Sequence, residues 1–293
     1  MSRIAYVNGR YVPHRDAMVH IEDRGYQYAD AVYEVCEVSQ GRLVDSTRHF
    51  DRLERSLNEL RIRQPMSRGA LMTVVLQTVA RNRVRNGIVY VQVSRGVAPR
   101  DHFLPPPTLP PAVVVTARAV DKAAGERSAR KGIGVITVPD NRWGRPDIKS
   151  VQLLPNTLAK QAAREAGASE AWFVDATGNV TEGGSSNAWI VTHDGRLVTR
   201  QADRSILRGV TRTGVLDLVK RRNLTIEERA FSVEEARGAA EAFITSATNP
   251  VTPVVRIDGH PVGDGTPGPV SLALRAAFHE VTEMSRPAIH GIK

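Results

Sequence analysis

Short strand-like segments alternate with helix-like segments along most of the chain, and this alternation constrains the fold more than any other feature of the sequence. Apolar residues recur every three to four positions after Ser46, a plausible N-cap, and a second helix is predicted at about 67–82. IVYVQVS (88–94) and AVVVTARAV (112–120) have the composition of strands. Four short turns predict hairpins: Asn8-Gly9, Gln40-Gly41, Asp194-Gly195 and Asp258-Gly259. We therefore expect an α/β (α+β) fold with mixed sheets.

A small, charged stretch, VDKAAGERSARK, gives the best domain boundary in the chain. It predicts a smaller N-terminal α/β domain of residues 1–120, a linker of residues 121–130 and a larger C-terminal domain of residues 131–293. Within the larger domain, further helices are expected at about 152–166 and 211–222 and from about 269 onward.

Composition excludes several classes of function. The net charge is +9, but the 40 basic residues include only six lysines, and the arginines are spread among acidic residues with few aromatics between them. This pattern favours a solvated surface over nucleic-acid binding. No segment is long and apolar enough to span a membrane, and no Cys/His cluster predicts a metal site. Cys36 is the single cysteine, so a cytoplasmic protein without an internal disulfide is expected.

Lys149 is the one lysine whose setting suggests chemistry. It follows a loop that contains Trp143, Gly144 and Pro146, and it precedes an apolar segment. A buried lysine has a lowered pKa and can act as a nucleophile, although spacing alone also fits an ordinary loop lysine. The other lysines fit solvated positions: Lys122, Lys131, Lys160, Lys220 and Lys293.

Two glycine-containing segments could hold a flat, phosphorylated ligand. In VTEGGSSNAWIV, Glu182 ends a strand before two glycines, which would let a ring approach the backbone, although a simple surface turn also fits. In ILRGVTR, Gly209 precedes a helix whose first turn holds Thr211. The unpaired N–H groups of a helix N-terminus suit a phosphate, and an ordinary N-cap is the alternative.

Three further segments allow both a functional and an ordinary interpretation. TSATNPVTP (245–253) leaves an apolar strand with hydroxyl groups that could add phosphate contacts. SRGVAPRDHFLP brings Arg100 and His102 into one loop, where a guanidinium and an imidazole could hold a carboxylate or could simply be solvated. The GxGxxG string at 263–268 contains Pro267 and opens no strand-to-helix unit, so we interpret it as a loop.

Taken in order, RPDIKSVQLLPNTLAKQAA, GNVTEGGSSNAWIV, ILRGVTR and ITSATNPVTP resemble the class IV (fold type IV) pyridoxal-phosphate (PLP) aminotransferases. The resemblance covers nearly the whole chain. EDRGYQYADAVYEV and APRDH narrow it to the D-amino-acid aminotransferase branch, for which the arginine-x-histidine pair is the most specific mark. It implies a two-domain homodimer that transaminates D-amino acids and 2-oxo acids, such as D-alanine or D-glutamate with pyruvate or 2-oxoglutarate.

The resemblance also implies a role for individual residues. Lys149 would carry PLP as a Schiff base and move the substrate proton, and Glu182 would face the pyridine nitrogen. Tyr33, Arg100 and His102 would hold the substrate carboxylate, the last two from the partner subunit. Leu207 would pack on the ring, and the phosphate would be bound by Arg52, Gly209, Val210, Thr211, Ser246 and Ala247.

Four positions depart from the family pattern. Ala29 and Ala31 stand where glycines are common, Gln152 replaces a shorter polar residue, and Ala247 replaces a phosphate-binding threonine. Losing one such charge-assisted hydrogen bond costs about 1.5–3 kcal/mol. On the same scaffold, a branched-chain L-aminotransferase, an (R)-amine transaminase and an aminodeoxychorismate lyase are alternatives. A basic binding protein without catalytic activity is an alternative from a different class.

Overall fold

The computed structural model describes residues 3–288 and divides into two compact units. Residues 3–122, 148–152 and 283–288 form the N-terminal unit, and residues 123–147 and 153–282 form the C-terminal unit. The short segment 148–152 therefore belongs to the N-terminal unit although it lies within the predicted C-terminal domain. The segment assigned to a linker forms a helix, α4 (Lys122–Lys131). The domain limits of 1–120 and 131–293 remain a prediction.

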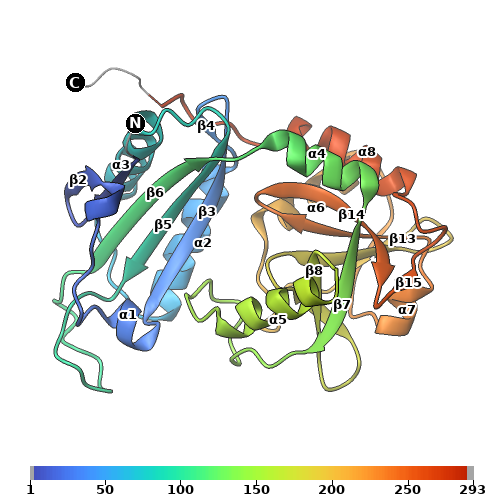
Figure 1. Ribbon diagram of the computed structural model, residues 1–293, viewed down its shortest axis with the longest axis horizontal. Helices are drawn as coiled ribbons and strands as arrows, with labels where there is room; N and C mark the ends of the chain where they lie inside the picture. Colours follow the sequence, from blue (N-terminus) through green and yellow to red (C-terminus); the bar gives the residue numbers. More distant parts are fainter. Residues whose placement is uncertain (1–2, 289–293) are drawn as a thin grey trace. The chain divides into compact units, whose positions relative to one another are not determined.

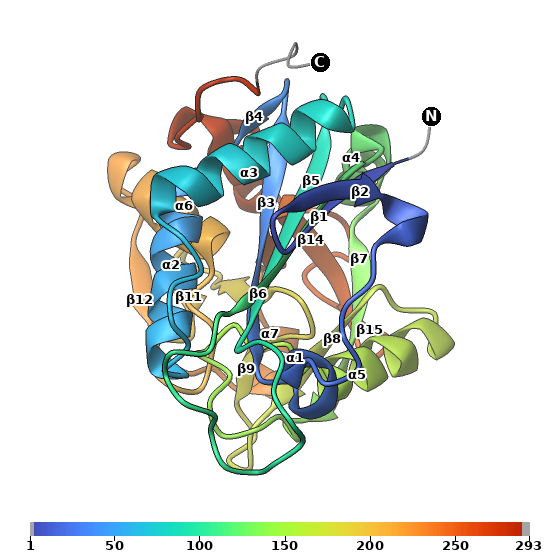
Figure 2. The same cartoon turned by 90° about the vertical axis from the view of Figure 1, so that its left-hand side faces the viewer.

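The N-terminal unit is built on an antiparallel six-stranded sheet of order β2-β1-β6-β5-β3-β4. Two helices, the amphipathic α2 (Ser46–Glu59) and α3 (Arg68–Arg81), pack on one face of it (Figure 2). The strands are β1 (Ile4–Val7), β2 (Arg10–Pro13), β3 (Ala31–Ser39), β4 (Arg42–Leu43), β5 (Gly87–Ser94) and β6 (Ala112–Ala119). A short 3-10 helix, His14–Asp16, follows β2.

Strand β3 shows how the two faces of this sheet differ. Its residues alternate between buried and half-buried, as one covered face and one open face require. The covered face carries Val32, Cys36 and Val38, and it also carries the buried carboxylate of Glu34. The opposite face carries Tyr33. A charged group on the covered face needs partners there, and α2 supplies them.

Turn chemistry agrees with the sequence in the predicted hairpins. Asn8 and Gly9 both have positive φ (45° and 94°), as do Gln40 and Gly41 (52° and 76°). These values match the primed turns that join twisted antiparallel strands. The Asp258-Gly259 hairpin likewise connects β14 (Asn249–Ile257) to β15 (His260–Pro261).

The predicted N-cap Ser46 is wrong, because Asp45 is the N-cap of α2 and Ser46 is its first helical residue. The Asp45 carboxylate does not cap the helix either. It accepts a hydrogen bond from the backbone N–H of Glu283 (3.0 Å), near the end of the described chain. A contact between residues so far apart in sequence leaves no local signal.

Helix α1 (Arg24–Tyr28) was not predicted, and it ends in an unusual way. Asp23 caps its N-terminus by accepting from the Gly25 N–H, and Ala29 follows its C-terminus with φ 55° and ψ 25°. This left-handed conformation normally favours glycine, because a Cβ crowds the backbone there. The departure at Ala29 therefore places a strained residue two positions before the strand that carries Tyr33.

The C-terminal unit contains a mixed nine-stranded sheet of order β12-β11-β10-β13-β14-β7-β8-β9, with β15 paired to β14. Pairs β11–β12, β14–β7 and β7–β8 are parallel, and the others are antiparallel. Besides β14 and β15, the strands of this sheet are β7 (Ile133–Pro139), β8 (Glu170–Val174), β9 (Val180–Gly183), β10 (Asn187–Val191), β11 (Leu197–Thr199), β12 (Ile226–Glu228) and β13 (Glu241–Ser246).

Helices lie close to the predicted positions in this unit. The predicted ones are α5 (Leu154–Glu165), α6 (Val210–Arg221) and α8 (Pro269–Ala277). A short helix α7 (Val233–Arg237) precedes β13, and the 3-10 turn Phe278–Glu280 follows α8. Figure 1 shows α4 beside α8, where Arg275 and Glu126 form an ion pair of 2.7 Å. Strand β10 is buried along its whole length, because Ala188 and Ile190 enter one apolar cluster and Trp189 and Val191 enter another.

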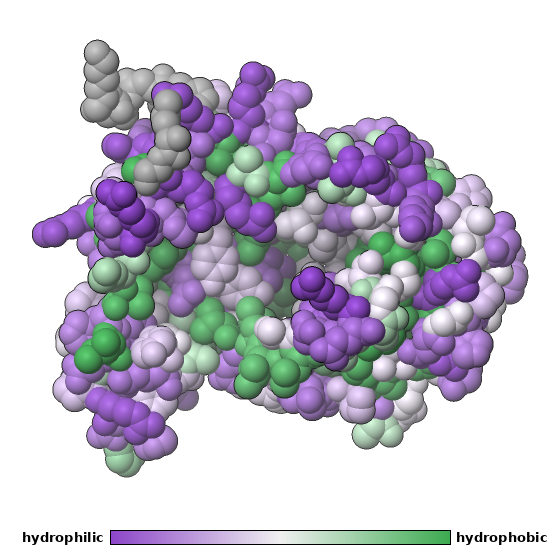
Figure 3. Space-filling view, viewed as in Figure 1, coloured by the Kyte–Doolittle hydropathy of each residue, from purple (hydrophilic) through white to green (hydrophobic). Residues whose placement is uncertain are grey.

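Within residues 3–288, no helix has the length and apolarity that a membrane span requires. In the face of the molecule drawn in Figure 3, hydrophilic side chains predominate and hydrophobic ones form separate patches.

Candidate active site

Lys149 lies beside the start of β3 in the N-terminal unit. Its backbone carbonyl accepts from the Tyr33 N–H (3.0 Å), and its own N–H donates to the Ser56 hydroxyl (3.3 Å). Val151 N–H donates to the Ala31 carbonyl, so the segment 148–152 runs along the end of the strand. The Lys149 Nζ atom lies 4.3 Å from the centroid of the Tyr33 ring. Two of the predicted site residues are therefore in direct contact, and Lys149 is half-buried.

The open face of the sheet continues from Tyr33 to β5. The Tyr33 ring stacks on Tyr90 at 5.6 Å, and the Tyr90 hydroxyl donates to Gln92 (2.7 Å). Burial raises the pKa of Tyr90 above its ordinary value. A cavity of about 420 Å³ in the same unit is lined by Val19, Asp23, Gly25, Tyr26, Gln92, Ser94, Ala112, Val114 and Val151.

Arg52 lies on α2 with 10% of its side chain exposed and is held by Glu34. Its Nε and Nη2 atoms bind the two oxygens of that carboxylate at 2.7 and 2.8 Å, and His49 Nδ1 lies 2.7 Å from Glu34 Oε2. Burial alone would raise the pKa of Glu34, but the Arg52 guanidinium and His49 outweigh burial and lower it. Sequence reasoning identified Arg52 and missed Glu34, the partner that fixes its orientation.

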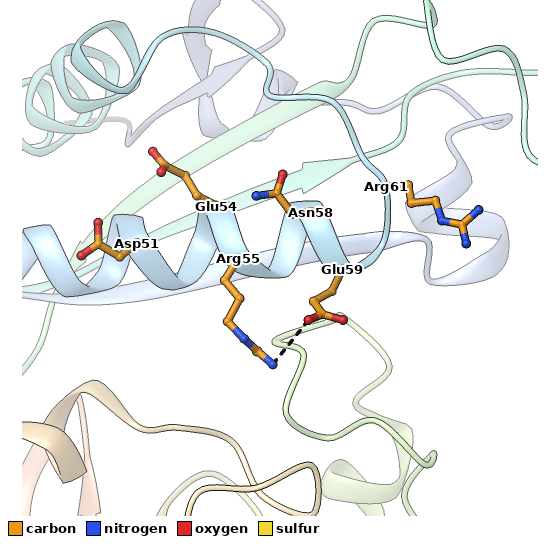
Figure 4. A pocket seen from close by; sticks show the side chains of 6 residues that line it. All are labelled: Asp51, Glu54, Arg55, Asn58, Glu59 and Arg61. Carbon is orange, nitrogen blue, oxygen red and sulfur yellow. Dashed lines mark ion pairs between the residues drawn. The ribbon is translucent and has the colours of Figure 1, made fainter.

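The same unit has a second hollow, of about 630 Å³, along the exposed side of α2 (Figure 4). It is lined by Asp51, Glu54, Arg55, Asn58, Glu59 and Arg61, and Arg55 and Glu59 form an ion pair of 3.8 Å. It is shallow and open, and none of the predicted site residues lines it.

Arg100 and His102 are exposed on the loop that follows β5. The Arg100 guanidinium carbon lies 5.2 Å from the centroid of the Tyr28 ring, and the His102 ring meets the same ring edge-on at 5.6 Å. The structure thus brings these two predicted residues together through a third residue that the sequence did not indicate.

Glu182 is buried on β9 in the C-terminal unit and accepts hydrogen bonds from three residues. Arg142 Nη1 donates to Oε1, Asn187 Nδ2 donates to Oε2 (3.0 Å), and the Leu207 N–H lies 3.1 Å from both oxygens. The alternative of an exposed glutamate in a glycine turn is wrong, because only 5% of Glu182 is exposed. Charged and neutral donors stabilise an ionised carboxylate, the form that can face a protonated pyridine nitrogen.

Arg142 is a site residue that sequence reasoning missed. Its Nε and Nη2 atoms bind the Asp140 carboxylate at 2.9 and 2.7 Å, so one guanidinium joins Asp140 to Glu182. Burial would lower the pKa of Arg142, but these two carboxylates raise it. The one local signal was its position just after an apolar strand, in the sequence DNRW.

Asn187 connects Glu182 to the next predicted segment. Its Nδ2 atom donates to Glu182 and also to the Leu207 carbonyl, each at 3.0 Å. A Cβ on Gly209 would lie 2.0 Å from Asn187 Oδ1, so only glycine fits there. Asn187 was also missed, since a side-chain contact across about twenty residues is invisible to local patterns.

The turn between Glu182 and Asn187 is packed rather than open. The buried Glu170 carboxylate accepts from Ser185 and Ser186 hydroxyls at 3.1 and 3.0 Å. Lys160 Nζ donates to the Ser169 carbonyl (2.7 Å) and lies 3.2 Å from Glu170. The interpretation of Lys160 as simply solvated is therefore wrong.

Helix α6 begins with Gly209 as its N-cap, and no side chain caps it. Val210 and Thr211 in its first turn are buried. A helix N-terminus leaves backbone N–H groups without intrahelical partners, which suits a phosphate. A second candidate phosphate-binding segment is the turn between β13 and β14. In this turn the Ser246 hydroxyl donates to the Asn249 carbonyl (3.2 Å). At Ala247 the side chain carries no donor, so that position offers only its backbone N–H.

Gln152 precedes α5 instead of lying on it, contrary to prediction, because the helix begins at Leu154. No group of three His, Cys, Asp or Glu side chains in residues 3–288 is arranged to hold a metal ion.

Comparison with known proteins identifies the family. The pattern of the family described as Amino-transferase class IV matches residues 31–257. The chain belongs to the class IV aminotransferases. Relatives named D-alanine aminotransferase include that of Staphylococcus haemolyticus, 37% identical over 279 residues (95% of this chain and 97% of the relative). That of Listeria innocua is 41% identical over 275 residues, 94% of each chain.

Solved structures of branched-chain amino acid aminotransferases have the same fold. The T.th. enzyme, in a crystal structure with pyridoxamine 5'-phosphate, has a TM-score of 0.86 and 28% identity, covering 96% of this chain and 94% of its own. The Escherichia coli enzyme has a TM-score of 0.89 at 24% identity, covering 96% and 95%. The predicted fold type IV architecture is confirmed.

Class IV aminotransferases use PLP, and the residues of each unit suit it. The N-terminal unit offers a half-buried lysine amine over a tyrosine ring. The C-terminal unit offers a buried carboxylate for the ring nitrogen and an uncapped helix N-terminus for the phosphate.

Proposed function

We propose that this chain is a cytoplasmic D-amino-acid aminotransferase. It transfers amino groups between D-amino acids, such as D-alanine and D-glutamate, and 2-oxo acids, such as pyruvate and 2-oxoglutarate. One observation carries the proposal: Arg100 and His102 lie together on one exposed loop, against one ring. A guanidinium fork binds a carboxylate bidentately, and an imidazole adds a hydrogen bond or fixes the loop. The relatives named D-alanine aminotransferase support the assignment.

The remaining roles follow from the chemistry of each group. PLP, when bound, withdraws electrons from the substrate and stabilises charge at its Cα. Lys149 would carry the cofactor covalently, and its amine, once released, would take the proton from the substrate Cα and deliver it to C4′ of the cofactor. Glu182 keeps the pyridine nitrogen protonated, and Arg142 and Asn187 hold Glu182 in place.

The phosphate-binding role of the next residues is the one that the family resemblance implies. Arg52 supplies a guanidinium that Glu34 orients. The N-terminus of α6 supplies backbone N–H groups at Gly209, Val210 and Thr211, and the turn of Ser246 and Ala247 supplies further backbone N–H groups. Leu207 would pack on one face of the PLP ring.

The substrate carboxylate is bound by Tyr33 together with Arg100 and His102 of the partner subunit in a homodimer. A protein partner is supported by the exposed apolar side chains of the N-terminal unit. Met18, Ile21, Tyr26 and Phe103 are each at least 75% exposed, and a partner subunit would cover apolar side chains of this kind. Holding the carboxylate fixes which face of Cα meets Lys149, and hence the configuration of the substrate.

The decisive experiment is a panel of D- and L-amino acids with pyruvate or 2-oxoglutarate as acceptor. We expect kcat/KM for D-alanine to exceed that for L-alanine by a large factor. Arg100→Ala should raise KM for amino acids by about ten- to a hundredfold, since a charge-assisted hydrogen bond contributes about 1.5–3 kcal/mol. In the same variant, KM for substrates without a carboxylate, such as (R)-1-phenylethylamine, should stay unchanged.

A branched-chain L-aminotransferase is the second candidate, because solved structures with that activity share this fold. The carboxylate would then sit the other way round in the pocket. A preference for L-leucine or L-valine over D-alanine would establish that function and exclude the D-specific one.

A further inference from the structure

The loop that carries Arg100 and His102 is exposed, yet both side chains contact the same aromatic ring. Tyr28, at the end of α1, has the Arg100 guanidinium carbon 5.2 Å from its ring centroid and the His102 ring edge-on at 5.6 Å. Long exposed side chains lose rotamer freedom only when something holds them. A single ring between the two is such a restraint.

The Tyr28 ring is itself held in place by a further neighbour, Arg24. The Arg24 guanidinium carbon lies 4.5 Å from the ring centroid, and Arg24 is buried. Its Nε atom binds the Asp30 carboxylate (2.9 Å), which orients the guanidinium. Its Nη1 atom donates to the backbone carbonyl of Asp101 (2.8 Å), the residue between Arg100 and His102. Arg24 therefore fixes the ring and the loop backbone together.

The backbone of the same loop is also anchored further back. The Arg24 N–H donates to the Gly96 carbonyl (2.9 Å), and the Ala98 N–H donates to the Glu22 carbonyl (3.3 Å). These bonds fix where the loop leaves β5 but not how its two charged side chains are oriented. The ring of Tyr28 is the feature that contacts both.

We propose that Tyr28 is a positioning residue that preorients Arg100 and His102 for the substrate carboxylate. The inference rests on the proposed function, in which these two residues bind that group. It acts through the face and edge of the ring, because the buried Tyr28 hydroxyl has no hydrogen-bond partner within residues 3–288. In the proposed homodimer, Tyr28 of one subunit thus shapes a binding site that belongs to the other.

The first test compares Tyr28→Leu with Tyr28→Phe in the PLP-loaded enzyme. Loss of a cation–π contact should raise KM for D-alanine about fivefold in Tyr28→Leu, with kcat nearly unchanged. Tyr28→Phe keeps the ring and should keep KM. Tyr11→Leu is the matched control, because it removes a ring from Arg81 (4.3 Å) in the same unit; it should leave KM unaltered. An unchanged KM in Tyr28→Leu overturns the proposal.

The second test repeats Tyr28→Leu in an Arg100→Ala background. If Tyr28 acts through Arg100, the second substitution should add much less to KM than it does alone. A full, additive effect would mean that Tyr28 only supports the fold, and would overturn the proposal. If Arg100→Ala alone leaves KM unchanged, the carboxylate role of Arg100 fails first, and with it the proposed function.

A third measurement decides the matter if Tyr28→Leu does not fold. Fluorinated phenylalanines at position 28 keep the ring shape while they progressively weaken its negative face. KM for D-alanine should rise with each added fluorine. A KM that is independent of fluorination overturns the role of the ring.

Discussion

The two units hold their predicted cofactor residues by different means. In the N-terminal unit, side-chain charges act on one another in the interior: Glu34 binds Arg52 and His49 behind the strand that carries Tyr33. In the C-terminal unit, Glu182 is held by Arg142, by Asn187 and by a backbone N–H, next to glycines that have no room for a side chain. Damage to the first arrangement should therefore affect folding, whereas damage to the second should affect turnover.

Loss of Lys149 should have the largest effect on function and a small effect on folding. Lys149→Ala is expected to abolish transamination and covalent attachment of PLP, because Lys149 is the lysine in contact with Tyr33. Lys220→Ala, at an exposed position on α6, is the matched control and should keep both. Borohydride reduction followed by peptide mapping checks the assignment. Cofactor found on any other lysine would contradict it.

Loss of Glu34 should have the largest effect on stability. Glu34→Ala leaves the largely buried Arg52 charge without its carboxylate, and breaking a buried pair in this way costs about 3–5 kcal/mol. Urea denaturation of the wild type and the variant measures the difference. A change below about 1 kcal/mol would place this pair with exposed ion pairs instead.

Acid should weaken the same contact. The folded-state pKa of Glu34 is lowered below its unfolded value of about 4.3. The pair therefore stabilises the fold above that pH, and the stabilisation is lost as the pH falls toward the folded-state pKa. Below this unfolded-state pKa, the wild-type free energy of unfolding should fall more steeply with pH than that of Glu34→Gln.

Glu182→Gln should lower activity more than stability, the opposite of what is expected for Glu34→Ala. The amide keeps the shape and cannot stabilise a protonated pyridine nitrogen by charge, so activity should fall more than about tenfold, or about 1.4 kcal/mol of transition-state stabilisation. PLP should still bind, as its visible absorption after gel filtration would show. A smaller loss of kcat/KM would remove Glu182 from the role proposed for it.

Ala29→Gly should give the smallest effect, and in the stabilising direction. Ala29 has φ 55°, and a residue with a Cβ costs about 1 kcal/mol or more in that conformation. Part of this gain is offset by the greater freedom of glycine in the unfolded chain. Thermal unfolding should show a modestly higher Tm for the variant, and a lower Tm would refute the interpretation.

Local patterns predicted the hairpins and most of the helices, because turn residues that favour positive φ and apolar periodicity both depend only on residues that are close together in the sequence. They could not predict that residues 148–152 leave the C-terminal unit to pair with β3. Nor could they predict Asp45 as an N-cap, since its carboxylate binds the Glu283 N–H.

The site shows the same limit. Lys149 and Glu182 were identified from motifs that resemble a family. Arg142, Asn187 and Glu34 act on those residues or on Arg52 through contacts between distant segments. The sequence around each of these three residues contains no recognisable motif. The residues that hold the predicted groups in place are therefore identified only by the three-dimensional structure.

The single cysteine can report local unfolding of the N-terminal unit, because its thiol lies in the interior of that unit. Cys36 lies on the covered face of β3, two residues from Glu34, and 2% of it is exposed. Burial raises the pKa of its thiol, so a thiol reagent reacts with it only when the strand is uncovered. The labelling rate of this thiol therefore measures how often strand β3 separates from helix α2, without any engineered probe.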